Sequence, residues 1–222
     1  MNKKRLLTLM GGTKKPWYLA AGVTPIAAYQ AIGASSYAES LVNLANPGTY
    51  NLTEEGAGAI TWAAATGWKG DGTNYFNTGI SPANQNYTYL IRFTGYNTDN
   101  HTKYTFGFYN SVGGLSTARF LNYPYDNFVR YNNAGTLQAA PSITNGVICI
   151  AGSKAYRNGV VETGTMTNWT VATTYPIFIL ASNNEGTASG VYVGGVQAFV
   201  IFNSVLTPTQ VATLSTKMSN LT

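Results

Sequence analysis

The C-terminal end of the chain carries the clearest pattern of hydrophobic and polar positions. Apolar side chains occupy most positions of residues 196–202, which is typical of a strand buried on both faces. A helix start follows, in which Thr207 can act as the N-cap and Pro208 suits the first helical position. Gln210 completes the spacing of a capping box. The pattern therefore predicts a central strand followed by one short, docked helix.

Alternation of apolar and polar positions recurs along most of the remaining chain. Between residues 87 and 93 every odd-numbered side chain is aromatic or aliphatic, so this segment predicts a strand with one buried face. The pair Asn158-Gly159 predicts a two-residue hairpin, because both residues accept the positive φ angles of a type I′ turn. The adjacent Glu54 and Glu55 are expected in a loop. Further strands are predicted at residues 26–29, 75–79, 104–108, 118–121, 127–131, 146–152 and 177–182, with a short helical turn within residues 34–45.

The spacing of these segments indicates one all-β domain. About a dozen short strands separated by turns are typical of a two-sheet antiparallel sandwich. Only 9% of the residues are charged, whereas the chain has 16 Tyr and 24 Gly, which suits strands and tight turns better than surface helices. We expect residues 17–222 to form a single sandwich domain that follows an N-terminal arm of residues 1–16.

The net charge of +5 is concentrated in that arm. The remaining eight Lys and Arg residues are balanced by the eight Asp and Glu residues, so the body is neutral. A nucleic-acid-binding domain would carry its positive charge on the folded body, so no nucleic-acid partner is expected. The arm is predicted to bind a neighbouring protein, with a tail that only aids solubility as the alternative. Its basic residues are Lys3, Lys4, Arg5, Lys14 and Lys15.

Two further features limit where the chain works. The first residues begin like a signal peptide, but the apolar run after Arg5 is short and is broken at Gly11 and Gly12. No apolar run reaches the length of a transmembrane helix, so no membrane insertion is expected. The single cysteine, Cys149, lies in an apolar run and is predicted to be a small buried side chain.

Six short motifs occur in a characteristic order, at residues 26–29, 67–76, 87–93, 155–160, 195–202 and 206–210. In this order they resemble the concanavalin A-like lectin/glucanase superfamily in its laminin-G-like form. The resemblance covers residues 24–220 and implies a jelly-roll sandwich that ends in a core strand and a short helix. This superfamily contains glycosidases, lectins, adhesion modules and virion proteins, so the fold does not select a function.

Residues 28–37 and 43–50 carry a narrower resemblance, to jelly-roll proteins encoded by tailed bacteriophages. Those proteins are exposed head fibres, decoration proteins or tail components. The resemblance implies a non-enzymatic structural protein of a phage particle, anchored through its basic arm and surrounded by other virion proteins and copies of itself. It also implies a virion location after assembly in the host cytoplasm, with secretion as the alternative.

The acidic residues do not form the catalytic pattern of this superfamily. Its glycosidases carry Glu-x-Asp-x-x-Glu on one strand, which places the carboxylates on one face. No two acidic residues here are separated by two or four positions, and Glu54 and Glu55 would point to opposite faces of a strand. His101, the only histidine, is expected in a polar loop. The chain is therefore predicted not to be an enzyme, and a glycosidase that uses Glu54 or Glu55 is the alternative.

Two predicted loops carry side chains suited to sugars. Aromatic rings and amide groups occur at Tyr123, Tyr125 and Asn127, and further amides occur at Asn183 and Asn184. The alternative is that the rings pack over a sheet edge and the Asn side chains cap turns. A carbohydrate-binding module for host-surface glycans is therefore the second functional hypothesis.

Aspartates in turns leave calcium as the one metal to consider. Asp71, Asp99 and Asp126 could supply carboxylate ligands beside carbonyl oxygens, as laminin-G-like domains sometimes do. Isolated aspartates in turns otherwise serve the turn itself. One cysteine and one histidine cannot build a zinc site of the usual type, and no cofactor is expected.

Overall fold

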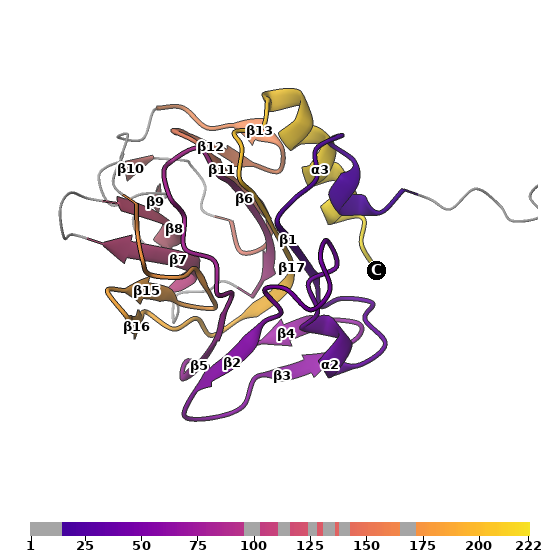
Figure 1. Cartoon of the computed structure of the whole chain (residues 1–222), viewed down its shortest axis with the longest axis vertical. Helices are drawn as coiled ribbons and strands as arrows, with labels where there is room; N and C mark the ends of the chain where they lie inside the picture. The colour runs from indigo at the N-terminus through magenta and orange to yellow at the C-terminus, as the bar shows by residue number, and fades with distance from the viewer. Residues whose placement is uncertain are drawn as a thin grey trace, which may run out of the picture.

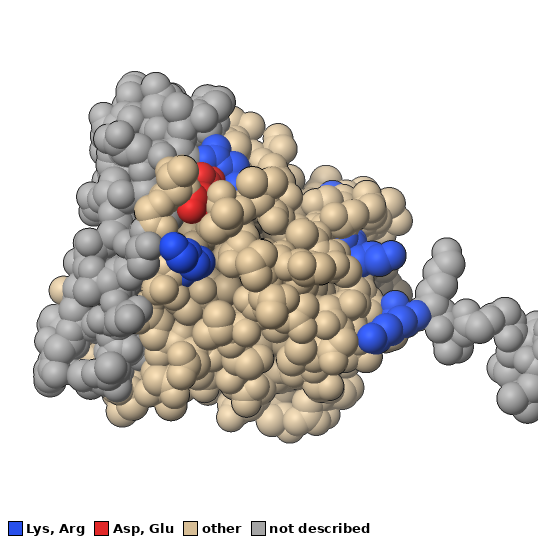
Figure 2. All heavy atoms as spheres, turned by 90° about the horizontal axis from the view of Figure 1, so that it is seen from above, with Lys and Arg blue, Asp and Glu red and all other residues tan. Residues whose placement is uncertain are grey.

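The chain forms two β-sheets packed face to face, with a helix at the C-terminal end of the described chain (Figure 1). The computed structural model describes residues 15–95, 103–110, 116–123, 128–130, 136–137, 143–164 and 172–222. The expected all-β sandwich is confirmed. None of the described helices is long and apolar enough to span a membrane. Charged side chains are sparse on the face seen from above (Figure 2), as the composition predicts.

Each sheet is described by its order of neighbouring strands. The first sheet runs β13 (Val160–Val161), β12 (Lys154–Arg157), β11 (Gly146–Ala151), β6 (Thr88–Thr94), β17 (Gly195–Phe202), β4 (Gly67–Lys69) and β3 (Thr61–Ala63), and β1 (Ala27–Gln30) also pairs with β17. The second sheet runs β10 (Thr136–Leu137), β9 (Phe128–Arg130), β8 (Ser116–Tyr123), β7 (Tyr104–Asn110), β14 (Phe178–Ile179), β5 (Asn74–Asn77) and β2 (Thr53–Gly56). Strand β15 (Ser182–Asn184) adds to β7 in parallel and pairs with β16 (Thr187–Ser189).

Strand β17 is the centre of the first sheet. It pairs antiparallel with β6 on one side and with β1 and β4 on the other. All eight of its residues are buried. Val196 and Phe199 face the interior between the sheets, whereas Ala198 and Val200 belong to a second apolar cluster that includes the closing helix. The predicted burial on both faces is therefore confirmed.

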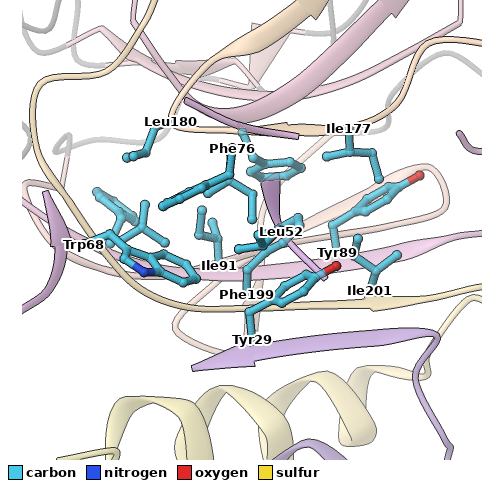
Figure 3. Close-up of a cluster of buried hydrophobic side chains, with 14 of the residues drawn as sticks. Tyr29, Leu52, Trp68, Phe76, Tyr89, Ile91, Ile177, Leu180, Phe199 and Ile201 are labelled. Atoms are coloured by element: carbon cyan, nitrogen blue, oxygen red, sulfur yellow. The ribbon is translucent and has the colours of Figure 1, made fainter. Parts of the chain in front are cut away.

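Aromatic side chains fill the interior between the sheets (Figure 3). The rings of Trp68 and Phe76 lie 4.8 Å apart between centroids, and those of Phe106 and Phe199 lie 5.2 Å apart. Tyr89 of β6 lies in the same interior, as the alternation in that segment predicted. Burial of these large apolar surfaces is the main source of the stability that holds the two sheets together.

Helix α3 (Pro208–Ser219) closes the outer face of the first sheet. Its start is the predicted capping box, in which the Gln210 N–H donates to Thr207 Oγ1 at 3.3 Å and Gln210 Oε1 accepts the Thr207 N–H at 2.9 Å. At its other end, Arg92 of β6 donates to two backbone carbonyl oxygens, at 3.0 and 2.7 Å. A cation at a helix C-terminus is also favoured by the helix dipole. The cap thus completes the start of the helix, and Arg92 fixes its C-terminal end to the sandwich.

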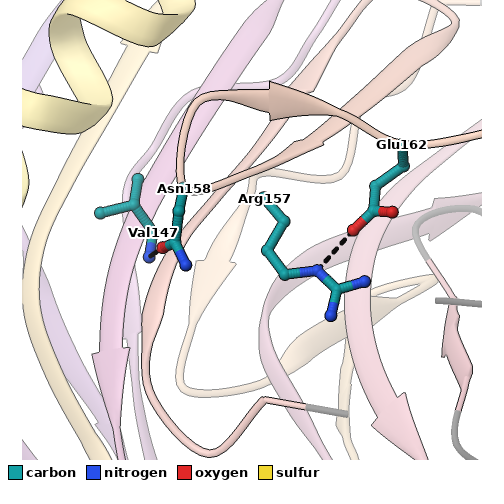
Figure 4. A network of polar contacts seen from close by, with 4 residues as sticks. All are labelled: Val147, Arg157, Asn158 and Glu162. Carbon is teal, nitrogen blue, oxygen red and sulfur yellow. Dashed lines mark hydrogen bonds and ion pairs between the residues drawn. The ribbon is translucent and has the colours of Figure 1, made fainter. Parts of the chain in front are cut away.

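The hairpin between β12 and β13 has the predicted Asn-Gly turn (Figure 4). Asn158 and Gly159 have φ angles of 49° and 84°, as a type I′ turn requires. The Asn158 side chain also accepts the Val147 N–H at 2.9 Å, and Arg157 donates to Glu162 at 2.5 Å across the hairpin. On the neighbouring strand β11, Cys149 is buried as predicted, and burial raises the pKa of its thiol.

Two sequence-based predictions of local structure need correction. The expected loop around Glu54 and Glu55 is wrong, because both residues lie in β2 and pair with β5. The single strand expected at residues 177–182 is interrupted at Leu180, which has a φ of 69°. Strands β14 and β15 therefore make separate pairings with β7. In both places, pairing with distant strands decided the outcome.

Short helices complete the fold at two corners. The 3-10 helix η1 (Trp17–Leu19) and the residues after it pack on the α3 side of the sandwich. Gln210 of α3 donates to the Ala21 carbonyl at 3.2 Å. Helix α2 (Tyr37–Ser40) lies near β3 and β4, within the segment where a short helical turn was predicted (Figure 1).

Candidate functional site

A cleft of about 480 Å³ opens between the end of β1 and helix α2. It combines the amide, hydroxyl and carboxylate groups of three polar side chains with an apolar wall. Such a mixture of an apolar surface and a few convergent polar groups is typical of ligand-binding sites. The residues that line the cleft are Gln30, Gly33, Ala34, Ser35, Glu39, Val42 and Leu44.

The β1 side of the cleft is held by the central sheet. Gln30 pairs with Ala198 of β17, and its Nε2 donates to the Ile32 carbonyl at 2.9 Å. Gly33 follows with a φ of 73°, and a Cβ atom there would lie 2.3 Å from the Thr222 carbonyl oxygen. Only glycine fits this close approach without displacing the segment that follows α3.

Helix α2 holds the acidic side of the cleft. The Ser36 side chain caps the helix by accepting the Glu39 N–H at 3.1 Å. At the other end of α2, the buried Ser40 hydroxyl accepts the indole N–H of Trp68 at 2.8 Å, which ties the helix to the core. The Ser35 hydroxyl donates to Glu39 Oε2. These contacts orient the Glu39 carboxylate, which remains exposed at the cleft.

Asn43 fixes the apolar wall made by Val42 and Leu44. Its side chain is buried, and its Oδ1 accepts the backbone N–H groups of Ala28 and Ala45 at 3.0 and 3.1 Å. Its Nδ2 donates to two further backbone carbonyls at 3.0 and 2.9 Å. One buried amide thereby bonds to Ala28 of β1 and to Ile26 just before it, and also to Ala45 and Thr49 of the loop, so the wall is fixed relative to the sheet.

A second polar cluster surrounds Glu54 of β2. Its carboxylate accepts hydrogen bonds from the Tyr37 hydroxyl, from the Ile60 N–H at 2.5 Å and from Asn74 Nδ2 at 3.2 Å. Burial alone would raise the pKa of this carboxyl group, but its three hydrogen bonds outweigh that effect and lower it. Glu55 points the other way and accepts a hydrogen bond from Asn77 Nδ2 at 2.9 Å. The predicted opposite orientation of the two acids on a strand is confirmed.

Asp71 is the one calcium candidate within the described residues. Its Oδ1 accepts the N–H and the hydroxyl of Thr73, both at 2.8 Å, and these bonds hold the pKa of its carboxyl group below the ordinary value. This is the bonding of an aspartate in a turn. In the described part of the chain, no three His, Cys, Asp or Glu residues gather closely enough to hold a metal. Asp99 and Asp126 lie outside it, and a calcium ion stays a prediction.

Most of the site residues predicted from the sequence also lie outside the described residues. Lys15 is described and exposed, and β8 ends at Tyr123. The predicted site residues that are not described are Lys3, Lys4, Arg5, Lys14, Tyr125 and Asn127, and the loop histidine His101 is not described either.

The remaining two predicted glycan-binding residues lie in β15. Asn183 is buried, and its amide donates to the Pro176 carbonyl at 2.9 Å and accepts the Gly186 N–H at 2.8 Å. Asn184 beside it is exposed. Neither residue lines the cleft. Asn183 thus performs the turn-capping role considered as the alternative for these amides.

Sequence reasoning missed the polar groups that do line the cleft, namely Gln30, Ser35 and Glu39. The available signal was the Ser-x-x-Glu spacing from Ser36 to Glu39, which predicts a helix start. In the structure the helix start is present, but the Glu39 carboxylate bonds to Ser35 and lines the cleft. A capping motif in the sequence does not reveal that its acid faces a cavity.

Comparison with known proteins finds solved structures of similar fold but does not assign the chain to a family. No protein-family model matches the sequence, and no curated protein matches it. The fold is similar to that of domain 4 of AbnA, an extracellular GH43 arabinanase from Geobacillus stearothermophilus solved in complex with arabinotriose. That match has a TM-score of 0.54 and 17% identity, and covers 86% of this chain and 98% of the domain.

The fold is also similar to part of Trypanosoma rangeli sialidase, solved in complex with 2,3-difluoro-KDN. The TM-score is 0.60 at 14% identity, over 89% of this chain and 33% of the sialidase chain. This chain therefore spans about one third of the sialidase. At these identities the likeness establishes a shared β-sandwich fold, while the concanavalin A-like and phage resemblances stay predictions from the sequence.

Proposed function

We propose that this chain is a non-catalytic carbohydrate-binding domain and that the cleft beside α2 is its combining site. The observation that carries the proposal is the composition of the cleft. Sugars present hydroxyl groups, which donate and accept hydrogen bonds, beside apolar C–H faces. Glu39, Ser35 and Gln30 offer the polar partners, and Val42 and Leu44 offer the apolar surface.

The similar arabinanase domain supports this proposal. Nearly the whole of that domain, 98%, matches this chain, so the two are comparable as complete folding units. Its structure contains arabinotriose, which places a sugar on a sandwich of this shape. The sialidase match adds a second protein of carbohydrate chemistry whose chain contains the same fold.

The carboxylates favour binding over hydrolysis. A glycosidase needs two carboxyl groups that flank the scissile bond, and its acid needs a raised pKa. Glu39 is the one ionisable side chain among the described residues that line the cleft. The pKa of Glu54 is lowered instead of raised, and Glu55 points to the opposite face of β2. A general acid and its partner are therefore not brought together at these residues.

The proposal is tested by measuring binding of the purified chain to an array of neutral and acidic glycans, together with assays for released sugar. We expect binding without hydrolysis. Ala34→Trp would fill the cleft and lower the affinity by at least about tenfold. The matched control, Ala188→Trp in β16, replaces a similarly half-buried alanine on the other sheet and should bind normally. Absence of glycan binding, or hydrolysis that depends on Glu54, would overturn the proposal.

We propose, second, that this domain is displayed on a phage particle through residues 1–16. The sequence resemblance of residues 28–37 and 43–50 supports this location. Residues 17–21 belong to the folded body, because Tyr18 donates to the Leu44 carbonyl at 3.0 Å and the Ala21 carbonyl accepts a hydrogen bond from Gln210 of α3. A variant without the arm should therefore be cut after Pro16. Removal of residues 1–16 should leave a folded, glycan-binding body that no longer joins the particle. Normal incorporation of the shortened chain would contradict the anchoring role.

A further inference from the structure

Among the described residues that line the cleft, Glu39 is the one with a charged side chain. Glu39 Oε2 accepts the Ser35 hydroxyl, and Oε1 accepts no hydrogen bond from the described residues. A carboxylate can accept about four hydrogen bonds, so this group keeps most of its capacity for a ligand. Gln30 uses its Nε2 on the Ile32 carbonyl, and its Oε1 is a further acceptor at the same wall. The cleft therefore presents one negatively charged acceptor, Glu39, beside the neutral Gln30 amide, which accepts through Oε1 and has a second N–H to donate.

Arg92, the cationic residue in register with Gln30, is bonded to the end of α3 and not to the cleft. Gln30 of β1 and Arg92 of β6 both pair with Ala198, so the two side chains lie in one row across the sheet. The Arg92 guanidinium donates to the carbonyls of Met218 and Leu221 at the end of α3. Arg92 does not line the cleft. Its charge is occupied by the helix end and does not offset Glu39.

We propose that the cleft selects neutral sugars, with Glu39 accepting a hydroxyl hydrogen bond from the ligand, and that it excludes sugars carrying a carboxylate, such as sialic acids. The inference rests on the proposed function and adds the ligand class. A charged acceptor makes a stronger hydrogen bond to a sugar hydroxyl than a neutral one. A ligand carboxylate in the same cleft would face the Glu39 carboxylate, and like charges held close together oppose binding.

The experiment is isothermal titration of the full chain with a matched pair of sugars, lactose and 3′-sialyllactose, and with arabinotriose as a second neutral probe. We expect at least one neutral probe to bind about tenfold or more tightly than 3′-sialyllactose. Glu39→Gln should lower the neutral affinity about tenfold, because it replaces a charged acceptor with a neutral amide. It should also reduce the discrimination against 3′-sialyllactose. Glu185→Gln removes the same charge from the turn between β15 and β16 and should change neither affinity.

Three results would overturn the inference. They are a preference for 3′-sialyllactose, neutral-sugar binding that is unchanged in Glu39→Gln, and failure of every neutral probe to bind a chain that binds acidic glycans on the array. Each of these leaves carbohydrate binding itself intact. Failure of every glycan to bind would overturn the proposed function and the inference together, so the two failures are distinguishable. Circular dichroism of each variant confirms that it is folded.

Discussion

Two carboxylates at helix α2 are bonded very differently: Glu39 belongs to the helix, and Glu54 of β2 is bonded to its first residue, Tyr37. Glu54 accepts hydrogen bonds from Tyr37 of α2, from the Ile60 N–H and from Asn74 of β5. Glu39 accepts one side-chain hydrogen bond, from Ser35, four residues earlier in the chain. The first carboxylate joins three segments that are distant from one another in the sequence. The second belongs to a single turn of chain and lines a cleft.

The difference separates a structural role from a binding role. A carboxylate whose acceptor positions are mostly filled by protein donors has little capacity left for a ligand. Glu54 therefore acts as a clamp that holds α2 against the β2–β5 edge of the second sheet. Glu39 has the free capacity, and the clamp keeps the helix that carries it in place. Both acids are connected to the same helix, but we expect their substitutions to affect different properties.

The largest expected effect is on stability, from Glu54→Ala. The substitution leaves three donors without their acceptor, so the free energy of unfolding should fall by about 2 kcal/mol, as measured by urea denaturation. The substitution should affect glycan affinity less than it affects stability, because Glu54 does not line the cleft. Glu55→Ala, which removes one hydrogen bond from Asn77 on the opposite face, is the matched control and should cost less. Equal losses in the two variants would contradict the clamp.

A smaller effect is expected from Tyr37→Phe, which removes a single donor to Glu54 and keeps the ring. Loss of one hydrogen bond to a charged acceptor should lower the free energy of unfolding by about 1 kcal/mol. Burial and the contact with Glu54 both raise the pKa of the Tyr37 hydroxyl, so it stays protonated and donates throughout the neutral range. If Tyr37→Phe destabilises the wild type and the Glu54→Ala background equally, the two side chains are not coupled.

Acid should weaken the clamp by a smaller, graded amount. The pKa of Glu54 lies below its ordinary value of 4.5 in the folded chain, so its contribution to stability is present above that pH. The contribution is lost as the pH falls through the folded pKa. Urea denaturation between about pH 5.5 and 3 should therefore show a steeper loss for the wild type than for Glu54→Gln. Parallel curves would show that this carboxylate gains nothing from folding.

Local signals in the sequence were enough to predict the parts of the fold that depend on neighbouring residues. The capping box at Thr207 and Gln210 and the turn at Asn158 and Gly159 are each complete within a few residues. The two-sided burial of β17 could be predicted because both of its faces are apolar. The cap and the turn agree with the structure because the residues that form them are neighbours in the sequence, whereas β17 agrees because both of its apolar faces favour burial.

The candidate site could not be predicted in the same way. Strand β2 contains two adjacent glutamates, and it is a strand because β5 pairs with it, not because of its own composition. The cleft needs Gly33 packed against Thr222 and a buried Asn43 joined to β1, and neither contact has a signature in the sequence. The spacing of Ser36 and Glu39 is that of a helix start, whereas the place of Glu39 beside a cavity depends on how α2 is tied to Trp68.

The most direct test of the central claim is a crystal structure of the chain with the neutral sugar that binds it most tightly. We predict that a sugar ring lies in the cleft beside α2, against Val42 and Leu44, with a hydroxyl group donating to Glu39. The carboxylate of Glu54 should keep its three protein donors and make no contact with the sugar. A sugar bound elsewhere on the sandwich, with no ligand in the cleft, would contradict the claim.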